Sequence, residues 1–316
     1  MKLKLFPKIK PYKKGYLQVS NLHKIYYHLY GNPKAKPVLF LHGGPGGGTK
    51  PKHARYFNPK KYNIILFDQR GSAKSKPFAS IKENNIWHLV NDINKLLDFL
   101  RIKKTFIWGG SWGSTLALVY AINFPERVAG MLLRGIFLSR KKDYDFFYHG
   151  GTKEFFPEIW ERFSLIVPKY QQHRMIDYYL DKMQNGSKKE RHKFAYEWAL
   201  YEMSLVQLKT NWKEIKQSFK DYSWKSLAVL EAYYMKHHCF LQENYIINHI
   251  KRIDHIPITI AHGRYDFICL PSNAWELHSK MKKSKLFFTI AGHGSTETET
   301  LQKLMAEMKR LENKKW

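Results

Sequence analysis

Short apolar runs recur along the chain and alternate with segments whose apolar residues have helical spacing. Six of these runs end at or beside Gly, Asp or His, which is typical of parallel strands that carry their loops to one edge of a sheet. The six runs are PVLFLHGG, YNIILFDQ, TFIWGG, VAGMLLRG, IPITIAHG and KLFFTIAGHG. Two earlier runs, YLQVS and HKIYYHLYG, predict an antiparallel edge. The pattern therefore predicts an α/β fold with a mostly parallel central sheet.

The alternation of strands and helices stops between the fourth and fifth runs. From about Ser139 to Ile250 the pattern is helical, and this segment holds 23 of the 49 Phe, Trp and Tyr residues. So many rings must be buried against one another and against the domain below them. We therefore expect an inserted helical cap at 139–250, between two parts of one core domain at 1–138 and 251–316.

The segment TFIWGGSWGSTLALVY joins a predicted strand to a predicted helix through three glycines around Ser111. Glycines gather where a β-carbon would obstruct a tight turn. A strand, Gly-x-Ser-x-Gly and a helix together form the nucleophile elbow of α/β-hydrolases, which exposes a serine hydroxyl at the turn. The alternative is a chance match in an ordinary turn, and the strand and helix on either side argue against it. Ser111 is therefore the candidate nucleophile.

A serine hydroxyl becomes nucleophilic when a histidine accepts its proton and a carboxylate orients that histidine. In α/β-hydrolases the chain order is Ser, then Asp or Glu, then His. Asp266 lies in the loop after the fifth run, and His293 lies directly after the sixth. Asp254 is a weaker candidate for the carboxylate, and both assigned side chains could instead have structural roles. The order and the positions at strand ends favour a triad of Ser111, Asp266 and His293.

Two backbone N–H groups are needed to stabilise the oxyanion of an acyl-transfer intermediate. Trp112 directly follows the candidate nucleophile and supplies one. The glycine-rich loop in LFLHGGPGGG supplies the other, and Gly44 is the candidate. A phosphate-binding loop is the rival interpretation, but no Lys-Ser/Thr follows the glycines and no G-x-G-x-x-G opens a helix here. The predicted site contains no metal.

The motifs HGGPGGG, FDQRGSAKSKP, GGSWGSTLALVYA, LLRGIFL, GRYDFICLP and AGHGSTE resemble, in this order, those of the proline iminopeptidases. These enzymes are serine peptidases with the α/β-hydrolase fold, and the resemblance spans nearly the whole chain, including FFPEIWERF in the cap. It implies removal of an N-terminal proline from peptides without a cofactor. The chain departs from the family pattern at Ala73, where a glycine is usual, and at Gly294, where a serine is frequent.

An aminopeptidase must hold a cationic amine, and two glutamates on apolar helix faces are candidates for this role. Glu202 lies four residues after Trp198, and Glu231 lies three residues before Tyr234. A carboxylate on an apolar face is costly unless it is paired or used. The resemblance implies that these two glutamates bind the substrate amine. Pairing with surface lysines is the alternative, and Glu197 is a substitute for Glu202.

Three further features of the sequence concern the surroundings of the site. Arg134 at the end of MLLRG is a candidate partner for one of the glutamates. Phe146 and Tyr234 are candidate walls for a slot that accepts a pyrrolidine ring, with no basis for choosing between them. Cys269 lies three residues after the predicted triad aspartate. A buried, passive thiol is its expected role, although alkylation of this thiol could block the site.

Composition limits the class of protein. The N-terminus has no apolar signal region, no run approaches the length of a membrane span, and the two cysteines form no disulfide framework. We therefore expect a cytoplasmic enzyme without membrane contact, either a monomer or a small homo-oligomer. The net charge of +28 could attract nucleic acid, but no nucleic-acid-binding motif accompanies it.

Three hypotheses follow from these patterns. The first is a prolyl aminopeptidase that acts on peptides with N-terminal proline. The second keeps the fold and triad but acts as an esterase or amidase on small substrates. The third is a basic nucleic-acid-binding protein on an inactive hydrolase scaffold, which the intact triad order argues against.

Overall fold

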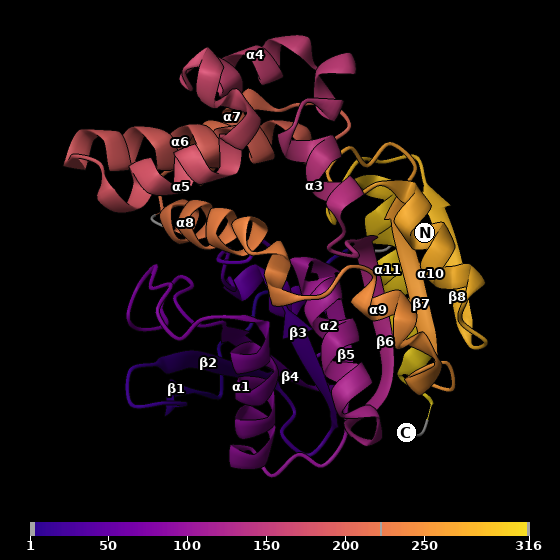
Figure 1. Cartoon of the computed structure of the whole chain (residues 1–316). Helices are drawn as coiled ribbons and strands as arrows, with labels where there is room; N and C mark the ends of the chain where they lie inside the picture. The colour runs from indigo at the N-terminus through magenta and orange to yellow at the C-terminus, as the bar shows by residue number, and fades with distance from the viewer. Residues whose placement is uncertain (1–3, 222, 315–316) are drawn as a thin grey trace.

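Eight strands form one sheet in the computed structural model, which describes residues 4–221 and 223–314 (Figure 1). The strands are β1 (Lys13–Gln18), β2 (Lys24–Gly31), β3 (Lys36–Leu41), β4 (Tyr62–Asp68), β5 (Thr105–Ser111), β6 (Val128–Ile136), β7 (Ile258–Gly263) and β8 (Ser284–Thr289). Their order is β1-β2-β4-β3-β5-β6-β7-β8. Neighbours from β4 to β8 are parallel, whereas β2 pairs antiparallel with β1 and β4. The predicted fold class and its antiparallel edge are confirmed.

Alternate residues of the central strands point into two apolar layers, as expected for a parallel sheet covered on both faces. Leu39 and Leu41 of β3 are buried in one layer, and Val38 and Phe40 are buried in the other. The first layer includes residues of α1, α2 and α10, and the second includes residues of α11. These helices are α1 (Ile86–Phe99), α2 (Trp112–Asn123), α10 (Pro271–Ser279) and α11 (Thr298–Leu311). Figure 1 shows α1 and α2 in front of the sheet.

The chain between β6 and β7 is helical, and all of its helices except the last form a separate group above the sheet (Figure 1). Its helices are α3 (Lys141–Tyr148), α4 (Pro157–Leu165), α5 (Met175–Asn185), α6 (Lys188–Leu205), α7 (Trp212–Ser218), α8 (Ser223–Lys236) and α9 (Tyr245–Asn248). We call α3 to α8 the cap. The short helix α9 lies against α2 of the core. The exact domain boundaries stay predictions.

Aromatic rings hold the cap together. The ring of Phe163 stacks on Tyr201 with centroids 4.1 Å apart and on Tyr179 at 4.6 Å. Tyr148 stacks on Trp198 at 4.8 Å and so connects α3 to α6. Such pairs add stability beyond their buried area. The aromatic richness of the insert therefore serves its packing.

Helix α8 joins the cap to the loops at the carboxyl ends of β3 and β4. The Ser226 hydroxyl donates to the Gly46 carbonyl at 2.8 Å and accepts from the Ala73 N–H at 3.2 Å. A β-carbon at Gly46 would lie 2.4 Å from the Ser226 carbonyl oxygen, so the contact requires glycine. The cap therefore lies over the edge of the sheet where the predicted site residues gather. Every helix in the described part of the chain is too short or too polar to cross a membrane.

Candidate active site

Ser111 lies at the turn between β5 and α2 with a backbone conformation that L-residues rarely adopt. Its φ is 58° and its ψ is −132°. A β-carbon at Gly109 would lie 2.4 Å from the Gly113 carbonyl oxygen, and one at Gly113 would lie 2.2 Å from that of Leu41. The two glycines therefore let strand and helix approach closely enough to force the turn. A strained turn of this kind places the serine hydroxyl at the end of the strand, where Ser111 lies buried under the cap.

Asp266 and His293 form a buried pair beside this turn. His293 Nδ1 lies 2.8 Å from Asp266 Oδ2, and the other carboxylate oxygen accepts the N–H groups of Ile268 and Cys269 at 3.0 and 2.8 Å. Burial raises the pKa of Asp266, but the charge and hydrogen bond of His293 outweigh it and bring the pKa below its usual value. The aspartate is therefore ionised and orients the imidazole with its proton on Nδ1.

The Ser111 side chain lies within hydrogen-bonding reach of the Cys269 thiol. Among the described residues, no hydrogen bond joins Ser111 Oγ to His293. Hydrogen bonds of catalytic groups are frequently long before substrate binds, so this geometry does not exclude Ser111 and His293 as partners. Burial lowers the pKa of His293, which keeps the imidazole neutral and able to accept that proton.

Gly44, Ser111 and Trp112 line a narrow slot of about 20 Å³ under the cap. This volume accommodates about one water molecule. Gly43 lies closer to the nucleophile, because a β-carbon there would be 3.2 Å from Ser111 Cβ. Gly43 was not among the predicted site residues, although it is one of the glycines of HGGPGGG. The two candidate oxyanion residues, Gly44 and Trp112, are therefore brought together at the serine.

Gln69 connects the two parts of this candidate oxyanion site. Its Oε1 accepts the indole N–H of Trp112 at 2.9 Å, and its Nε2 donates to the His42 carbonyl at 3.0 Å. His42 immediately precedes the glycine-rich loop, so one buried side chain holds the loop and the elbow at a fixed separation. Gln69 belongs to the motif FDQRG, and the motif alone predicts no role for it. Only the folded structure relates this glutamine to both segments.

Glu202 of α6 and Glu231 of α8 meet inside the cap and are hydrogen-bonded to each other. The indole N–H of Trp198 donates to Glu231 Oε2 at 2.7 Å, and Tyr148 lies beside Glu231 in the same slot. Glu202 Oε2 is buried without a partner among the described residues. Burial raises the pKa of Glu202 to about 7 and raises that of Glu231 well above its usual range. The pair therefore retains a proton, and a cation would satisfy the unpartnered oxygen.

Glu231 and Ser111 line the same slot, and the other walls are mainly aromatic. Phe137, Phe147 and Tyr148 supply rings there. The sequence pattern does not indicate these three residues, because Phe137 precedes the cap and the other two depend on how α3 docks. A small ring that enters the slot must displace its water and move a side chain such as the flexible Met235.

The two residues expected as walls lie elsewhere, so that expectation is wrong. Phe146 packs against Phe155, with ring centroids 6.4 Å apart. Tyr234 is buried behind the slot, where its hydroxyl donates to Asn84 and its ring meets the edge of Trp112.

Both substitutes considered for the acidic residues make ion pairs away from the slot. Glu197 pairs with Arg162 through two hydrogen bonds of 2.8 and 2.9 Å. Asp254 pairs with Lys282 at 2.9 Å.

Arg134 lies between the candidate triad and the glutamates. Its NH1 donates to the His293 carbonyl at 2.6 Å, and its Nε is buried without a partner among the described residues. Its charge acts on Glu202, where it opposes the effect of burial on the pKa. Arg134 therefore acts on Glu202 through its charge, whereas its direct hydrogen bond goes to the carbonyl of His293.

A parallel sheet with a strained serine at a strand–helix turn defines the α/β-hydrolases. A family model described as the alpha/beta hydrolase fold matches residues 36–299. Proline iminopeptidase from Arabidopsis thaliana is 40% identical over 296 residues, which are 93% of this chain and 78% of that protein. Probable proline iminopeptidase from Leptolyngbya boryana is 41% identical over 304 residues, which are 95% of this chain and 94% of that protein. The chain therefore belongs to the proline iminopeptidase family.

Solved structures of more distant proteins share the fold. An esterase from Exiguobacterium antarcticum matches with a TM-score of 0.67 at 19% identity, over 95% of this chain and 99% of that one. An alpha/beta fold family hydrolase from Bacillus anthracis matches with a TM-score of 0.61 at 18% identity, over 94% and 99%. At such identities the likeness concerns the fold alone.

Proposed function

We propose that this chain removes an N-terminal proline from peptides by a serine-dependent mechanism. The observation that carries the proposal is the buried pair of Glu202 and Glu231 beside the candidate nucleophile. A carboxyl pair in an apolar, aromatic enclosure is costly without a function, and the unpartnered Glu202 oxygen is an acceptor for an amine. Membership of the proline iminopeptidase family supports the same substrate class.

The protonated secondary amine of proline carries two N–H donors, and the two glutamates offer an acceptor for each. Binding the cation favours the ionised form of Glu202, while Glu231, whose pKa is raised further, can keep its proton and still accept through its carbonyl oxygen. The amine then lies at one end of the slot and the first carbonyl lies at Ser111, whose position fixes which bond is attacked. Blocking the amine would remove the attraction, which makes the reaction specific for a free N-terminus.

In the first chemical step Ser111 Oγ attacks this carbonyl while His293 Nε2 takes the hydroxyl proton. The N–H groups of Gly44 and Trp112 stabilise the oxyanion of the tetrahedral intermediate. When the C–N bond breaks, His293 gives its proton to the leaving amine and a prolyl ester remains on Ser111. Water, deprotonated by His293, hydrolyses this ester and releases proline. Asp266 stays ionised throughout and keeps the imidazole oriented.

The experiment that tests the function compares a chromogenic proline amide with the same amide bearing an N-acetyl group. We expect rapid hydrolysis of the free amine, negligible hydrolysis of the acetylated compound, and loss of activity in Ser111→Ala. Preferred cleavage of the acetylated compound, or of a simple acyl ester, would favour the esterase or amidase alternative. A fluorophosphonate that fails to label Ser111 would contradict serine catalysis altogether.

The location and assembly of the protein are proposals of the same kind. We propose a cytoplasmic enzyme, because Cys239 and Cys269 are both free and buried. We also propose a monomer or small homo-oligomer whose basic surface remains solvated without binding nucleic acid. Light scattering after size-exclusion chromatography tests the assembly, and retention on a DNA column at about 0.15 M salt would contradict the absence of nucleic-acid binding.

A further inference from the structure

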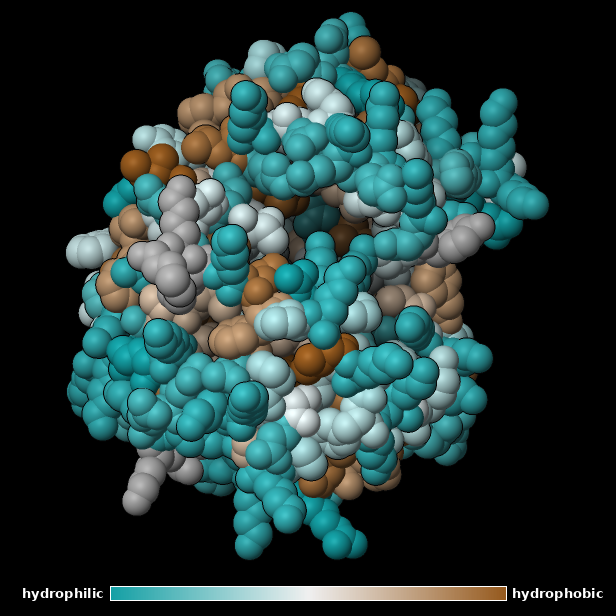
Figure 2. Space-filling model, turned by 180° about the vertical axis from the view of Figure 1, so that it is seen from behind, coloured by the Kyte–Doolittle hydropathy of each residue, from teal (hydrophilic) through white to brown (hydrophobic). Residues whose placement is uncertain are grey.

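A large cleft of about 660 Å³ opens at the boundary between the cap and the core, next to the candidate triad. Figure 2 shows a hollow between the upper and lower parts of the rear face, rimmed mostly by hydrophilic residues. Gly294, Ser295 and Thr296, which directly follow His293, form part of the cleft wall. Arg134, whose guanidinium donates to the His293 carbonyl, forms another part. The cleft therefore begins at the histidine that must protonate the leaving amine.

This cleft differs from the slot that contains Glu231. Among the described residues, no side chain lines both spaces. The slot is small and aromatic, whereas the cleft is more than large enough for a short peptide and lies in the usual size range of ligand sites, ~300–1,000 Å³. Proline occupies the slot in the proposed function, so the peptide released from it needs another path. The cleft provides one on the side of His293.

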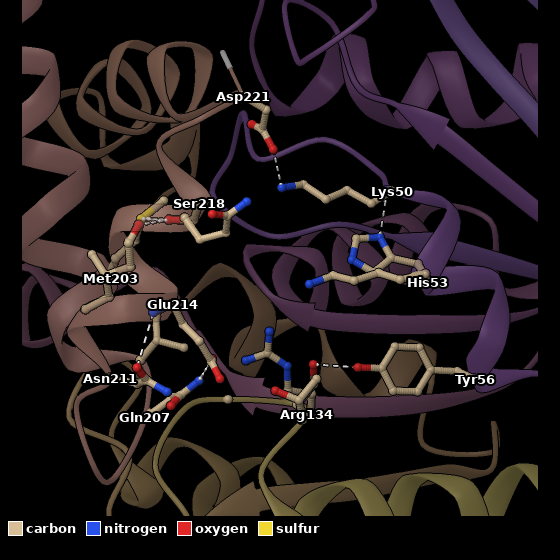
Figure 3. Close-up of a pocket in the computed structure, with 17 residues that line it drawn as sticks. Lys50, His53, Tyr56, Arg134, Met203, Gln207, Asn211, Glu214, Ser218 and Asp221 are labelled. Carbon is tan, nitrogen blue, oxygen red and sulfur yellow. Dashed lines mark hydrogen bonds and ion pairs between the residues drawn. The ribbon is translucent and has the colours of Figure 1, made fainter. Parts of the chain in front are cut away.

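Charged residues enter the cleft from both sides (Figure 3). Lys50 comes from the core and pairs with Asp221 of the cap at 2.6 Å. Glu214 of α7 accepts a hydrogen bond from Gln207 at 3.1 Å. His53 is partly buried, and desolvation lowers its pKa well below the usual value, so it is neutral. With Lys50 and Asp221 paired and His53 neutral, the two cations Lys52 and Arg134 outnumber the remaining carboxylate of Glu214, so the cleft keeps a net positive charge.

Lys52 is the unpaired cation at this site. Within residues 4–221 and 223–314 its ammonium group makes no hydrogen bond or ion pair, although Glu214 and Asp221 are close enough to act on its charge. Partial desolvation and the neighbouring Lys50 ammonium lower the pKa of Lys52. A carboxylate brought into the cleft would offset both effects. Arg134 adds a second positive charge nearer to His293.

We propose that the cleft binds the leaving peptide and that Lys52 determines specificity by pairing with a carboxylate of that peptide. This inference rests on the proposed function and adds the preferred leaving group to it. The C-terminal carboxylate of a short peptide and an acidic side chain offer the same chemistry. In either case, substrates whose leaving peptide carries a carboxylate are cleaved more efficiently than neutral substrates of the same length.

The test measures kcat/KM for Pro-Gly-Gly, its C-terminal amide and Pro-Gly-Asp amide, together with a neutral chromogenic proline amide. We expect about a fivefold preference for one or both carboxylate substrates over Pro-Gly-Gly amide, the upper end for a pair between exposed charges. The preference should appear mainly in KM and shrink at high salt. Pro-Gly-Gly tests recognition of a C-terminal carboxylate, and Pro-Gly-Asp amide tests recognition of a side-chain carboxylate.

The variants are Lys52→Gln and a matched control, Lys60→Gln, whose exposed lysine lies outside the cleft. Lys52→Gln should abolish the preference and leave hydrolysis of the neutral chromogenic amide unchanged, whereas Lys60→Gln should behave as wild type. Equal kcat/KM for acid and amide in an active wild type, or a preference that survives Lys52→Gln, would overturn the inference. Failure to cleave the neutral proline amide would instead refute the proposed function itself.

Discussion

The hydrolysis of a proline amide should depend on pH differently from that of a neutral acyl ester. Amine binding requires one ionised carboxylate of the pair, and Glu202 ionises first, because burial raises its pKa to about 7 whereas the pKa of Glu231 lies well above its usual range. The acid limb of kcat/KM for the amide should therefore have its midpoint near 7. At about pH 6 only about one-tenth of Glu202 is ionised, so kcat/KM falls about tenfold below its limiting value.

An ester without an amine needs only the neutral form of His293. Burial lowers the pKa of His293 below its ordinary value of 6.5. At about pH 6 the ester therefore loses less than about fourfold, and its acid limb lies below that of the amide. The assay is kcat/KM for both substrates over a series of pH values. The control Glu197→Gln, which breaks only the ion pair with Arg162, should keep both profiles, and coincident acid limbs in wild type would refute the reasoning.

The remaining predictions concern stability, positioning and the thiol. Because the folded-state pKa of Glu202 is raised from 4.5 to about 7, stability falls as pH rises through this window, by about 3 kcal/mol. Glu202→Gln should thus raise the melting temperature above about pH 7 and leave it little changed near pH 4.5. Gln69→Leu should lower kcat about tenfold with little change in KM, because Trp112 and the glycine loop lose their shared support; a change confined to KM would contradict this role. Iodoacetamide should modify Cys269 slowly, because burial raises its pKa, yet inactivate the enzyme, and Cys269→Ala should be active and resistant.

The sheet and the candidate triad could be predicted because both depend on the order of short segments along the chain. Strands such as β4 and β5 are buried along their whole length, so they appear as continuous apolar runs. Their carboxyl ends meet at one edge, which places Asp266 against His293 and Ser111 beside Cys269 whatever the cap does.

The walls of the slot could not be predicted, because they depend on how separate helices dock. Helix α6 has apolar and aromatic residues on most of its circumference, so the pattern alone did not separate Glu202, which points inward, from Glu197, which pairs with Arg162. The position of Tyr148 follows from stacking between α3 and α6, a contact between segments about fifty residues apart. Interactions of this kind have no periodic signal in the sequence.

The most direct test of the account is the ratio of kcat/KM for a proline amide to that for a short acyl ester, in wild type and in Glu202→Gln/Glu231→Gln. The account predicts that the ratio collapses by about 100-fold or more in the double variant, because two charge-assisted hydrogen bonds to the amine are lost. Ester cleavage should persist, because Ser111, His293 and Asp266 remain in place. An unchanged ratio would contradict the claim that the buried glutamates recognise the substrate amine.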